Sequence, residues 1–343
     1  MRDFFTSLFG NSDTKTRIGQ SILNDTLPHA YLIEGPDGSG KTLFAYLIAA
    51  ALSCENKNKT NLPLPCMHCS TCQKIMAKNY PDVYFVDRGE RASIPVETIR
   101  EMRSDMFLSA SESQFKVYII DDAHLMLAPS QNALLKVLEE PPKNVIILLL
   151  CNTSDTILTT IKSRTQTIRM SLFSFEEIKK YLLAHDKNAM LLQSKSEDEF
   201  SAAISYSDGS IGKAASYMNS KESSFIQKER QCVDEIIKSI SEKAGYTAFH
   251  DAYSLLSQKR SELTQELELL YCAIRDLILI KKDENASLVY YYDKEKAKEI
   301  SSTVGLQRLF TISDSIFSAI QDLSSNANVG IVTTTLINKQ KKQ

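Results

Sequence analysis

The stretch AYLIEGPDGSGKTLFAYLIAAALS, residues 30–53, decides the fold of this chain. Residues 30–34 form an apolar run that predicts a buried strand, and residues 42–53 predict a helix. Between them, residues 35–42 match G-x-x-x-x-G-K-[ST], in the strand-then-helix context in which this pattern binds phosphate. The stretch therefore predicts an α/β domain that carries a phosphate-binding loop.

Each residue type in this loop has a physical reason. Glycines let the backbone turn so that its N–H groups face an anion at a helix N-terminus, which already favours negative charge. Lys41 is expected to reach the β and γ phosphates of ATP or ADP, and Thr42 is expected to supply a hydroxyl to Mg²⁺. The predicted nucleotide-contacting residues are Gly35, Pro36, Asp37, Gly38, Ser39, Gly40, Lys41 and Thr42.

A magnesium site also needs a carboxylate opposite Thr42. The apolar segment 115–121 ends in Asp121, which Asp122 follows, and ligands of α/β folds bind at the carboxyl ends of strands. We expect Asp121 to hold Mg²⁺ through water and Asp122 to orient the attacking water. Because aspartate is one methylene shorter than the more usual glutamate, we expect nucleotide binding with weak or no hydrolysis by this chain.

Short apolar runs alternate with helical patterns up to about residue 170. This alternation is typical of a parallel sheet that helices cover on both faces. Strands are predicted at 30–34, 82–87, 115–121, 144–151 and 166–170, and helices at 42–53, 96–108 and 132–139.

From residue 172 the pattern is helical. Ser174-Phe-Glu-Glu177 fits a capping box. Residues 172–220 are interpreted as a small helical lid domain, with a break at Asp208–Gly212, and residues 221–343 as a helical oligomerisation (collar) domain.

Two apolar stripes in the second half have the spacing of helix-packing seams. They are Leu263, Leu267, Leu270, Ile274 and Leu277, and Leu309, Ile312, Ile316, Ile320 and Leu323. Each is either the core of one domain or an oligomer interface. The polar stretches 55–61 and 186–199 are predicted to be loops, and the final KQKKQ a frayed tail.

Four of the seven cysteines lie between residues 54 and 72. Four thiolates can complete a tetrahedral Zn²⁺ site with no open position, which makes such a site structural. The predicted ligands of this zinc module are Cys54, Cys66, Cys69 and Cys72. The alternatives are His68 in place of one thiolate, or an iron–sulfur cluster. The other cysteines, Cys151, Cys232 and Cys272, are expected in the core.

The composition excludes several classes of protein. A hydrophobic share of 43% and a charged share of 24% are those of a globular chain, and no apolar run approaches the ~18 residues of a membrane span. The N-terminus lacks a signal-peptide pattern. An odd number of cysteines without a secretory signal, four of them crowded between residues 54 and 72, indicates an intracellular metal site and not a disulfide framework. With 40 Lys and Arg against 42 Asp and Glu, any contact with DNA needs a local basic patch.

Several motifs, in this order, resemble the AAA+ clamp-loader subunits of bacterial DNA polymerase III along essentially the whole chain. They are Leu27–Pro36, the zinc module after the first helix, Asp121–His124, the run NALLKVLEEPP at 132–142 and Ser163-Arg164-Thr165. The delta-prime type resembles the chain more than the gamma/tau ATPase does. The chain ends after one collar-like domain, and residues 323–328 look like the delta-prime C-terminal pattern.

The resemblance implies a RecA-like P-loop AAA+ domain over residues 1–171. It also implies a cytoplasmic, nucleoid-associated subunit of a hetero-pentamer with gamma/tau and delta, which loads the sliding clamp onto primer–template DNA during replication. Arg164 aligns with the family's Ser-Arg-Cys arginine, which acts in trans as a finger in the ATP site of the neighbouring subunit. No membrane partner is implied.

Three positions depart from the family pattern. Thr165 replaces a cysteine, Gly212 stands where the ATPase subunits carry an arginine, and the usual sensor threonine falls at Cys151 or Asn152. Whether the chain is an enzyme is therefore open. The alternatives are a gamma/tau-like motor subunit, a stand-alone AAA+ ATPase of recombination or helicase loading, and a scaffold that binds no nucleotide.

Overall fold

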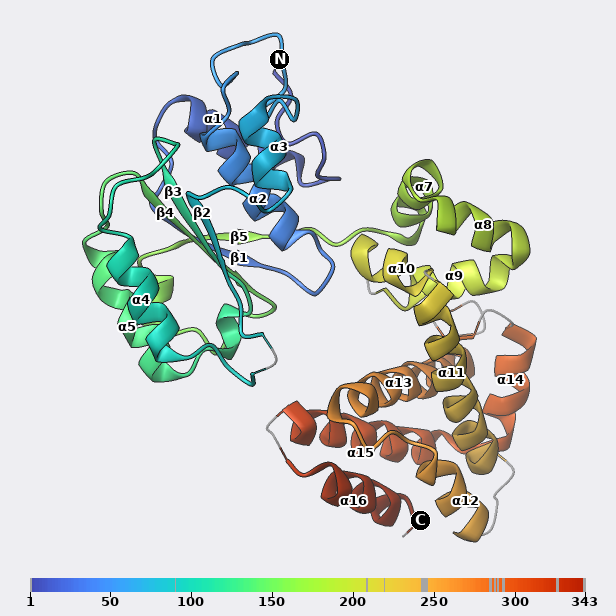
Figure 1. Cartoon of the computed structure of the whole chain (residues 1–343). Helices are drawn as coiled ribbons and strands as arrows, with labels where there is room; N and C mark the ends of the chain where they lie inside the picture. Colours follow the sequence, from blue (N-terminus) through green and yellow to red (C-terminus); the bar gives the residue numbers. More distant parts are fainter. Residues whose placement is uncertain are drawn as a thin grey trace. The chain divides into compact units, whose positions relative to one another are not determined.

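The computed structural model describes residues 2–89, 91–207, 209–218, 220–241, 246–283, 286, 288, 290–291, 294–324 and 327–341. The chain divides into two compact units, Met1–Leu172 and Phe173–Gln343, and each is described by itself (Figure 1). The division lies next to the predicted boundary at 171/172. The further division of the second unit into lid and collar domains stays a prediction.

A parallel sheet of five strands, in the order β2-β3-β4-β1-β5, forms the centre of the first unit. This confirms the predicted α/β domain. The strands are β1 Ala30–Glu34, β2 Val83–Val86, β3 Lys116–Ile120, β4 Val145–Cys151 and β5 Gln166–Arg169. Strand β4 is buried along its whole length, because it lies between β3 and β1 in a sheet covered on both faces.

Helices cover both faces of this sheet (Figure 1). They are α1 Ser12–Leu23, α2 Lys41–Leu52, α3 Ser70–Met76, α4 Val96–Asp105, α5 Ala128–Glu139 and α6 Thr159–Lys162, with a 3₁₀ turn at Ala123–Leu125. Successive residues of a strand point to opposite faces. Accordingly, Tyr31 and Ile33 join the core under α1, α2 and α3, and Leu32 joins the core under α4 and α5. Helices α1 and α3 were not predicted from the sequence.

Helix α1 packs closely against the aromatic ring of Phe4. A Cβ atom added at Gly19 would lie 2.1 Å from Cδ1 of Phe4, a distance that forces the ring to move. We expect Gly19→Ala to lower the free energy of unfolding by about 1–3 kcal/mol, as overpacking of a core does. Urea unfolding measures this change. The matched control is Gly305→Ala, because nothing lies within 4 Å of a Cβ added there; equal effects of the two substitutions would contradict the prediction.

The second unit is built from helices. They are α7 Phe175–His185, α8 Lys187–Lys195, α9 Glu197–Ser205, α10 Ile211–Tyr217, α11 Ser220–Ser241, α12 Tyr246–Ser254, α13 Arg260–Lys282, α14 Lys294–Thr303, α15 Leu306–Ser324 and α16 Val329–Lys341. One buried cluster runs from Ile178 to Met218 and a second from Cys232 to Ile337. Both predicted stripes lie in the second cluster, where α13 packs against α15, so they are core.

Some local predictions hold and others are wrong. The capping box at Ser174 and Glu177 is confirmed, and residues 55–61 are turns. The predicted loop 186–199 is wrong, because Asp186 and Ser196 cap α8 and α9 with their side chains. The predicted frayed tail is also wrong as far as residue 341, which ends α16. Asp208, Ser325, Asn326, Lys342 and Gln343 lie outside the described residues. None of the described helices is both long enough and apolar enough to cross a membrane.

Candidate functional site

The loop at residues 35–42, here called the phosphate loop, joins β1 to α2. Gly38 and Gly40 have φ angles of +72° and +91°, a left-handed conformation that glycine adopts without steric cost. A Cβ atom at Gly35 would lie 2.8 Å from Oγ of Ser39. The first N–H groups of α2 have no partner within the helix and therefore make this end of α2 suited to an anion.

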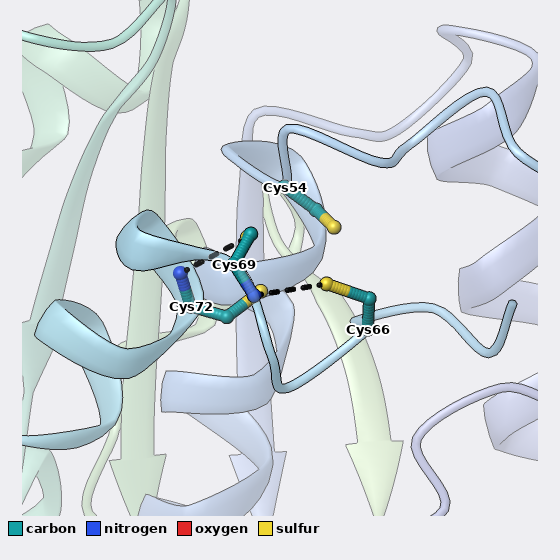
Figure 2. Close-up of side chains that lie close together, drawn as sticks. All are labelled: Cys54, Cys66, Cys69 and Cys72. Carbon is teal, nitrogen blue, oxygen red and sulfur yellow. Dashed lines mark hydrogen bonds between the residues drawn. The ribbon is translucent and has the colours of Figure 1, made fainter.

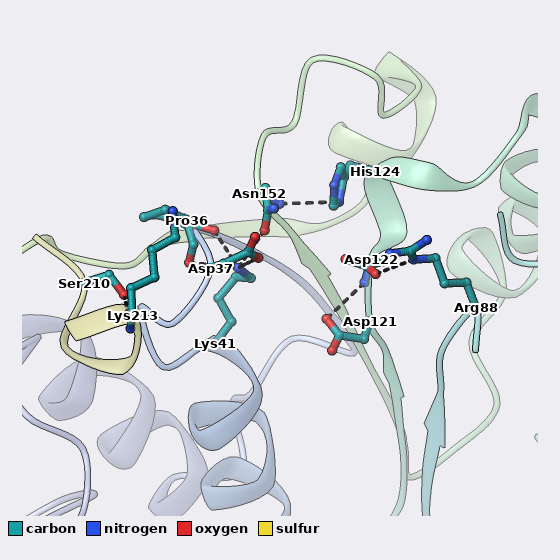
Figure 3. A network of polar contacts seen from close by, with 11 residues as sticks. Pro36, Asp37, Lys41, Arg88, Asp121, Asp122, His124, Asn152, Ser210 and Lys213 are labelled. Carbon is teal, nitrogen blue, oxygen red and sulfur yellow. Dashed lines mark hydrogen bonds and ion pairs between the residues drawn. The ribbon is translucent and has the colours of Figure 1, made fainter. Parts of the chain in front are cut away.

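The Lys41 side chain is buried under this loop (Figure 3). Its ammonium group donates to the carbonyl oxygens of Gly35 at 2.6 Å and Pro36 at 3.0 Å, and to Oδ1 of Asn152 at 2.9 Å. Burial lowers the pKa of Lys41, although the carboxylates of Asp37 and Asp121 oppose that shift. The cation thus points into the loop, where a phosphate group is its natural partner.

The residues of the phosphate loop fit a nucleotide phosphate group. Ser39 is 5% exposed, and its Oγ has no hydrogen-bond partner among the residues that the structure describes. A buried hydroxyl without a partner costs free energy, which a phosphate oxygen would recover. With a buried lysine and two left-handed glycines beside it, this orphaned hydroxyl supports the predicted nucleotide site.

The two predicted carboxylates have different surroundings. Asp121 follows β3 at the carboxyl edge of the sheet, and its Oδ1 accepts from the backbone N–H of Asp122 at 3.0 Å. Burial raises the pKa of Asp121. The Asp122 carboxylate instead binds Nε of Arg88 at 3.0 Å (Figure 3), and its backbone has a positive φ of 49°. The role of Asp122 in orienting water stays a prediction.

Three polar residues near the site were missed or left undecided by sequence reasoning. Arg88 follows β2 and pairs with Asp122, and Nδ1 of His124 accepts from the backbone N–H of Asn152 at 3.5 Å. Asn152, not Cys151, presents its side chain to Lys41, whereas Cys151 is fully buried. Only the sheet order places Asn152: β4 lies between β1 and β3, so the residue after β4 lies beside both the phosphate loop that follows β1 and the Asp121–Asp122 turn that follows β3.

Arg164 lies at the opposite edge of the sheet. It precedes β5, and β5 runs parallel to β1 with Tyr31 opposite Gln166, so Arg164 is at the amino end of these strands while the phosphate loop is at the carboxyl end. Its guanidinium pairs with Oε1 of Glu139 at 2.9 Å and donates to the carbonyl oxygen of Thr160 at 2.9 Å. Within one chain, this cation does not reach its own phosphate loop.

The four predicted zinc ligands lie together (Figure 2). The Sγ atoms of Cys54, Cys66, Cys69 and Cys72 are within 4.8 Å of one another, and all four residues are buried. A tetrahedron with Zn–S bonds of ~2.3 Å has edges of roughly 3.8 Å. His68 is exposed and is not part of this cluster.

The surroundings of these thiols fit a metal-bound thiolate set. The backbone N–H groups of Cys69 and Cys72 donate to Cys66 and Cys69 Sγ, each at 3.4 Å (Figure 2). A hydrogen bond from the Cys72 thiol lowers the pKa of Cys54 to about 5, and the same pairing raises the pKa of Cys72. Cys54 follows α2, and Cys69 caps α3, so two helix ends hold the cluster. Both Zn²⁺ and an iron–sulfur cluster suit four thiols.

Comparisons with known proteins place this geometry in context. Residues 10–174 match the family described as DNA polymerase III, delta subunit. The chain is 35% identical over 198 residues to the DNA polymerase III subunit gamma of Buchnera aphidicola subsp. Acyrthosiphon pisum, which covers 58% of this chain and 52% of that one. It is 26% identical over 311 residues to the delta-prime subunit of Bacillus subtilis, which covers 90% of this chain and 89% of that one.

The chain is similar to DNA polymerase III clamp-loader subunits. Its relatives include both gamma/tau and delta-prime subunits, so they do not identify the specific member. The chain spans about half the length of the gamma relative, 52%. A solved structure of a gamma-subunit-related protein from Thermotoga maritima aligns over 95% of this chain and 98% of that one, with 18% identity and a TM-score of 0.48.

The raised pKa of Asp121 predicts a pH-dependent effect on the stability of this chain. Burial makes the folded state bind this proton more tightly than the unfolded state does. Asp121 therefore weakens folding as pH rises from the unfolded pKa of ~3.9 through its folded pKa. We expect Asp121→Asn to stabilise the nucleotide-free chain at pH 7 by less than about 1 kcal/mol, since solvent screens a half-buried carboxylate, and the gain should vanish near pH 3.

Urea unfolding at the two pH values measures this effect. Asp314→Asn, which replaces an exposed carboxylate on α15, is the matched control and should show no such gain. A gain that is equal at both pH values would contradict the prediction, because it would not depend on ionisation of Asp121.

Proposed function

We propose that this chain is a delta-prime-like subunit of a DNA polymerase III clamp loader. In this role it would act in the cytoplasm near the nucleoid, in a hetero-pentamer with gamma/tau and delta subunits. The complex would load the sliding clamp onto primer–template DNA. One observation carries the proposal: the phosphate loop and Arg164 lie at opposite edges of one sheet. A chain built this way binds a nucleotide at one edge and offers a cation to a neighbour at the other.

At the first edge, we propose that the phosphate loop binds ATP or ADP with Mg²⁺. The backbone N–H groups of the loop and the Lys41 ammonium would hold the phosphates, the Thr42 hydroxyl and Asp121 would hold the metal, and Mg²⁺ would neutralise phosphate charge. Lys41 already has its ammonium inside the loop. It would exchange two carbonyl partners for phosphate oxygens.

Hydrolysis by this chain is proposed to be slow or absent. The carboxylate expected to orient water, Asp122, is engaged by Arg88 at 3.0 Å, and aspartate reaches less far than glutamate. A displacement of ~1 Å at such a position costs ~10²-fold in rate. The chain would therefore respond to nucleotide by binding it, and turnover would be the work of its partners.

At the second edge, Arg164 is proposed to act as an arginine finger in the adjacent subunit. A guanidinium stabilises charge on a transferring phosphoryl group. Arg164 is partly exposed and pairs with Glu139, an ion pair that a more strongly charged phosphate site of a neighbour would replace. The cysteine cluster is proposed to bind Zn²⁺ as a structural module, since four thiolates leave no open position.

A gamma-like motor subunit is the second candidate. The 35% identity to a gamma subunit and the intact phosphate loop favour it. The two candidates differ in the expected turnover of the isolated chain.

Two measurements test the proposal. Calorimetry with ADP and Mg²⁺ should show binding by the purified chain that Lys41→Ala weakens at least about 100-fold, since the variant loses a charge-assisted contact in a buried site. The native complex should be purified with the full chain as bait and its subunit stoichiometry determined by mass measurement. We expect one copy of this chain per complex. Brisk, Lys41-dependent ATP turnover with several copies per complex would favour the gamma-like motor subunit instead. Absence of ADP binding would favour the alternative of a scaffold that binds no nucleotide.

A further inference from the structure

Residues 2–8, here called the N-terminal segment, lie between the cysteine cluster and the phosphate loop. The connection between Cys54 and Cys66, residues 55–65, is called the metal loop. The Arg2 guanidinium donates to four carbonyl oxygens of the metal loop. The acceptors are Lys57 at 2.6 Å, Leu62 at 2.9 Å, Asn56 at 3.4 Å and Pro63 at 3.5 Å. The Arg2 side chain therefore hydrogen-bonds to both ends of the metal loop.

These contacts extend to a metal-ligand position. The Asn56 side-chain amide donates to Sγ of Cys66 at 3.4 Å. The backbone of the N-terminal segment pairs with Leu64, two residues before Cys66: Phe5 N–H donates to the Leu64 carbonyl at 2.8 Å, and Leu64 N–H donates to the Asp3 carbonyl at 3.0 Å. The position of the N-terminal segment thus depends on the shape of the metal loop.

The other end of the N-terminal segment contacts the phosphate loop. The rings of Phe5 and Phe44 meet edge to face, with centroids 5.2 Å apart, and both side chains are fully buried. A Cβ atom at Gly40 would lie 3.1 Å from Cδ1 of Leu8. The Lys15 ammonium holds the Leu8 carbonyl at 2.8 Å. Leu8 therefore packs directly against the glycine that precedes Lys41.

Helix α2 makes the second connection between the two sites. It begins at Lys41 and ends at Leu52, two residues before Cys54, and its 12 residues span about 18 Å. A rigid helix on one side and the N-terminal segment on the other thus connect the cysteine cluster to the phosphate loop.

We propose that Arg2 is a positioning residue that couples metal binding at the cysteine cluster to nucleotide binding at the phosphate loop. Four thiols brought to one ion fix the metal loop, the fixed loop presents four carbonyl oxygens to Arg2, and Arg2 holds Phe5 and Leu8 against Phe44 and Gly40. The inference rests on the proposed function, in which these sites take Zn²⁺ and ADP. Coupling between two sites is reciprocal, so ADP must also tighten the binding of Zn²⁺.

The test measures Zn²⁺ affinity of the full chain by competition with a chelator, with and without saturating ADP and Mg²⁺. Coupling between sites is commonly 5–150-fold, and we expect ADP to tighten Zn²⁺ binding about 10-fold in the wild type. The ratio of Zn²⁺ affinity with ADP to Zn²⁺ affinity without ADP measures the coupling. In Arg2→Met, which keeps the apolar stem and loses every donor, we expect Zn²⁺ and ADP each to bind but this ratio to fall towards one. Arg2→Lys, with a single ammonium, should retain part of the coupling.

Arg100→Met is the matched control. Arg100 is exposed on α4 and pairs with Glu97 at 3.8 Å, on the opposite face of the sheet, so this variant should keep the wild-type ratio. A merely structural role of Arg2 would lower the thermal midpoint of Arg2→Met and leave the ratio unchanged, which would overturn the proposal. A ratio of one in the wild type, with both ligands bound, would overturn it as well.

Failure of the proposed function can be distinguished from failure of the coupling by whether each ligand binds at all. Absence of ADP binding by the Zn²⁺-loaded wild type, or of Zn²⁺ binding by the cysteine cluster, would overturn the proposed function and this coupling together. Binding of both ligands without coupling would overturn only the inference about Arg2.

Discussion

Under the proposed role of Arg164 in trans, Arg164→Ala should lower ATP hydrolysis about 10³-fold at the ATP site of the neighbouring subunit in the proposed clamp-loader complex. Arginine fingers supply 10³–10⁵-fold in phosphoryl transfer, and we take the lower limit. The same substitution should leave the affinity of this chain for ADP unchanged, because Arg164 lies at the amino edge of the sheet and the phosphate loop at the carboxyl edge. Steady-state ATPase of the reconstituted complex and ADP calorimetry of the isolated chain measure the two quantities.

Glu139→Gln is the matched control for Arg164→Ala. It removes the charge that pairs with Arg164 at 2.9 Å and keeps the guanidinium, so the complex should keep its ATPase activity. A half-exposed ion pair contributes only ~0.2–1 kcal/mol to stability, and both variants should therefore fold. If Arg164→Ala left ATPase activity of the complex intact, or weakened ADP binding by the isolated chain, the role in trans would be wrong.

Under the proposed binding of Zn²⁺ by the cysteine cluster, removal of the ion should lower the thermal midpoint of the first unit by roughly 10 °C. A ligand present at 1,000 times its Kd adds about 4 kcal/mol to folding, and a unit of this size shifts by about 2–4 °C per kcal/mol. The four thiols also lie in a continuous core with α1 and α2, so their separation disturbs the sheet face behind them. Calorimetric scans with Zn²⁺ and with chelator measure the shift.

Cys72→Ser should reproduce the effect of the chelator and abolish any further response to it, because Cys72 is fully buried and lies within the cluster. Cys232→Ser is the control, since Cys232 is a buried cysteine of the second unit outside that cluster. It should lower stability without changing the response to chelator. A wild-type midpoint that is indifferent to chelator would contradict the structural role of the metal.

Local sequence patterns predicted much of the first unit. The strands at 30–34 and 145–151 were predictable because their apolar runs need no information from elsewhere in the chain. The segment 186–199 was wrongly predicted as a loop because it is mostly polar. It contains the two cap residues Asp186 and Ser196 and the buried Ala189, and the buried Phe200 follows directly after it. Polar composition describes the exposed face of a short helix as well as it describes a loop.

Some residues of the candidate site could also be assigned from the sequence, and others could not. Lys41 could be assigned from its position in the motif, whereas the partners of Asp122 could not, because Arg88 is 34 residues away and follows a different strand. Arg2 shows the same limitation more strongly. Its four acceptors lie 54 to 61 residues along the chain, and an isolated arginine near the N-terminus has no local pattern that marks it.

Sequence alone determined where this chain makes its phosphate loop and its cysteine cluster, since each is specified by residues within a short span whose spacing sets the backbone geometry. Tertiary structure decided which charged groups meet. Parallel strands bring the phosphate loop and Asp121 to one edge of the sheet and leave Arg164 at the other. The physical reason is that the direction and order of the strands determine at which edge of the sheet each residue lies. Neither property is contained in the spacing of neighbouring residues.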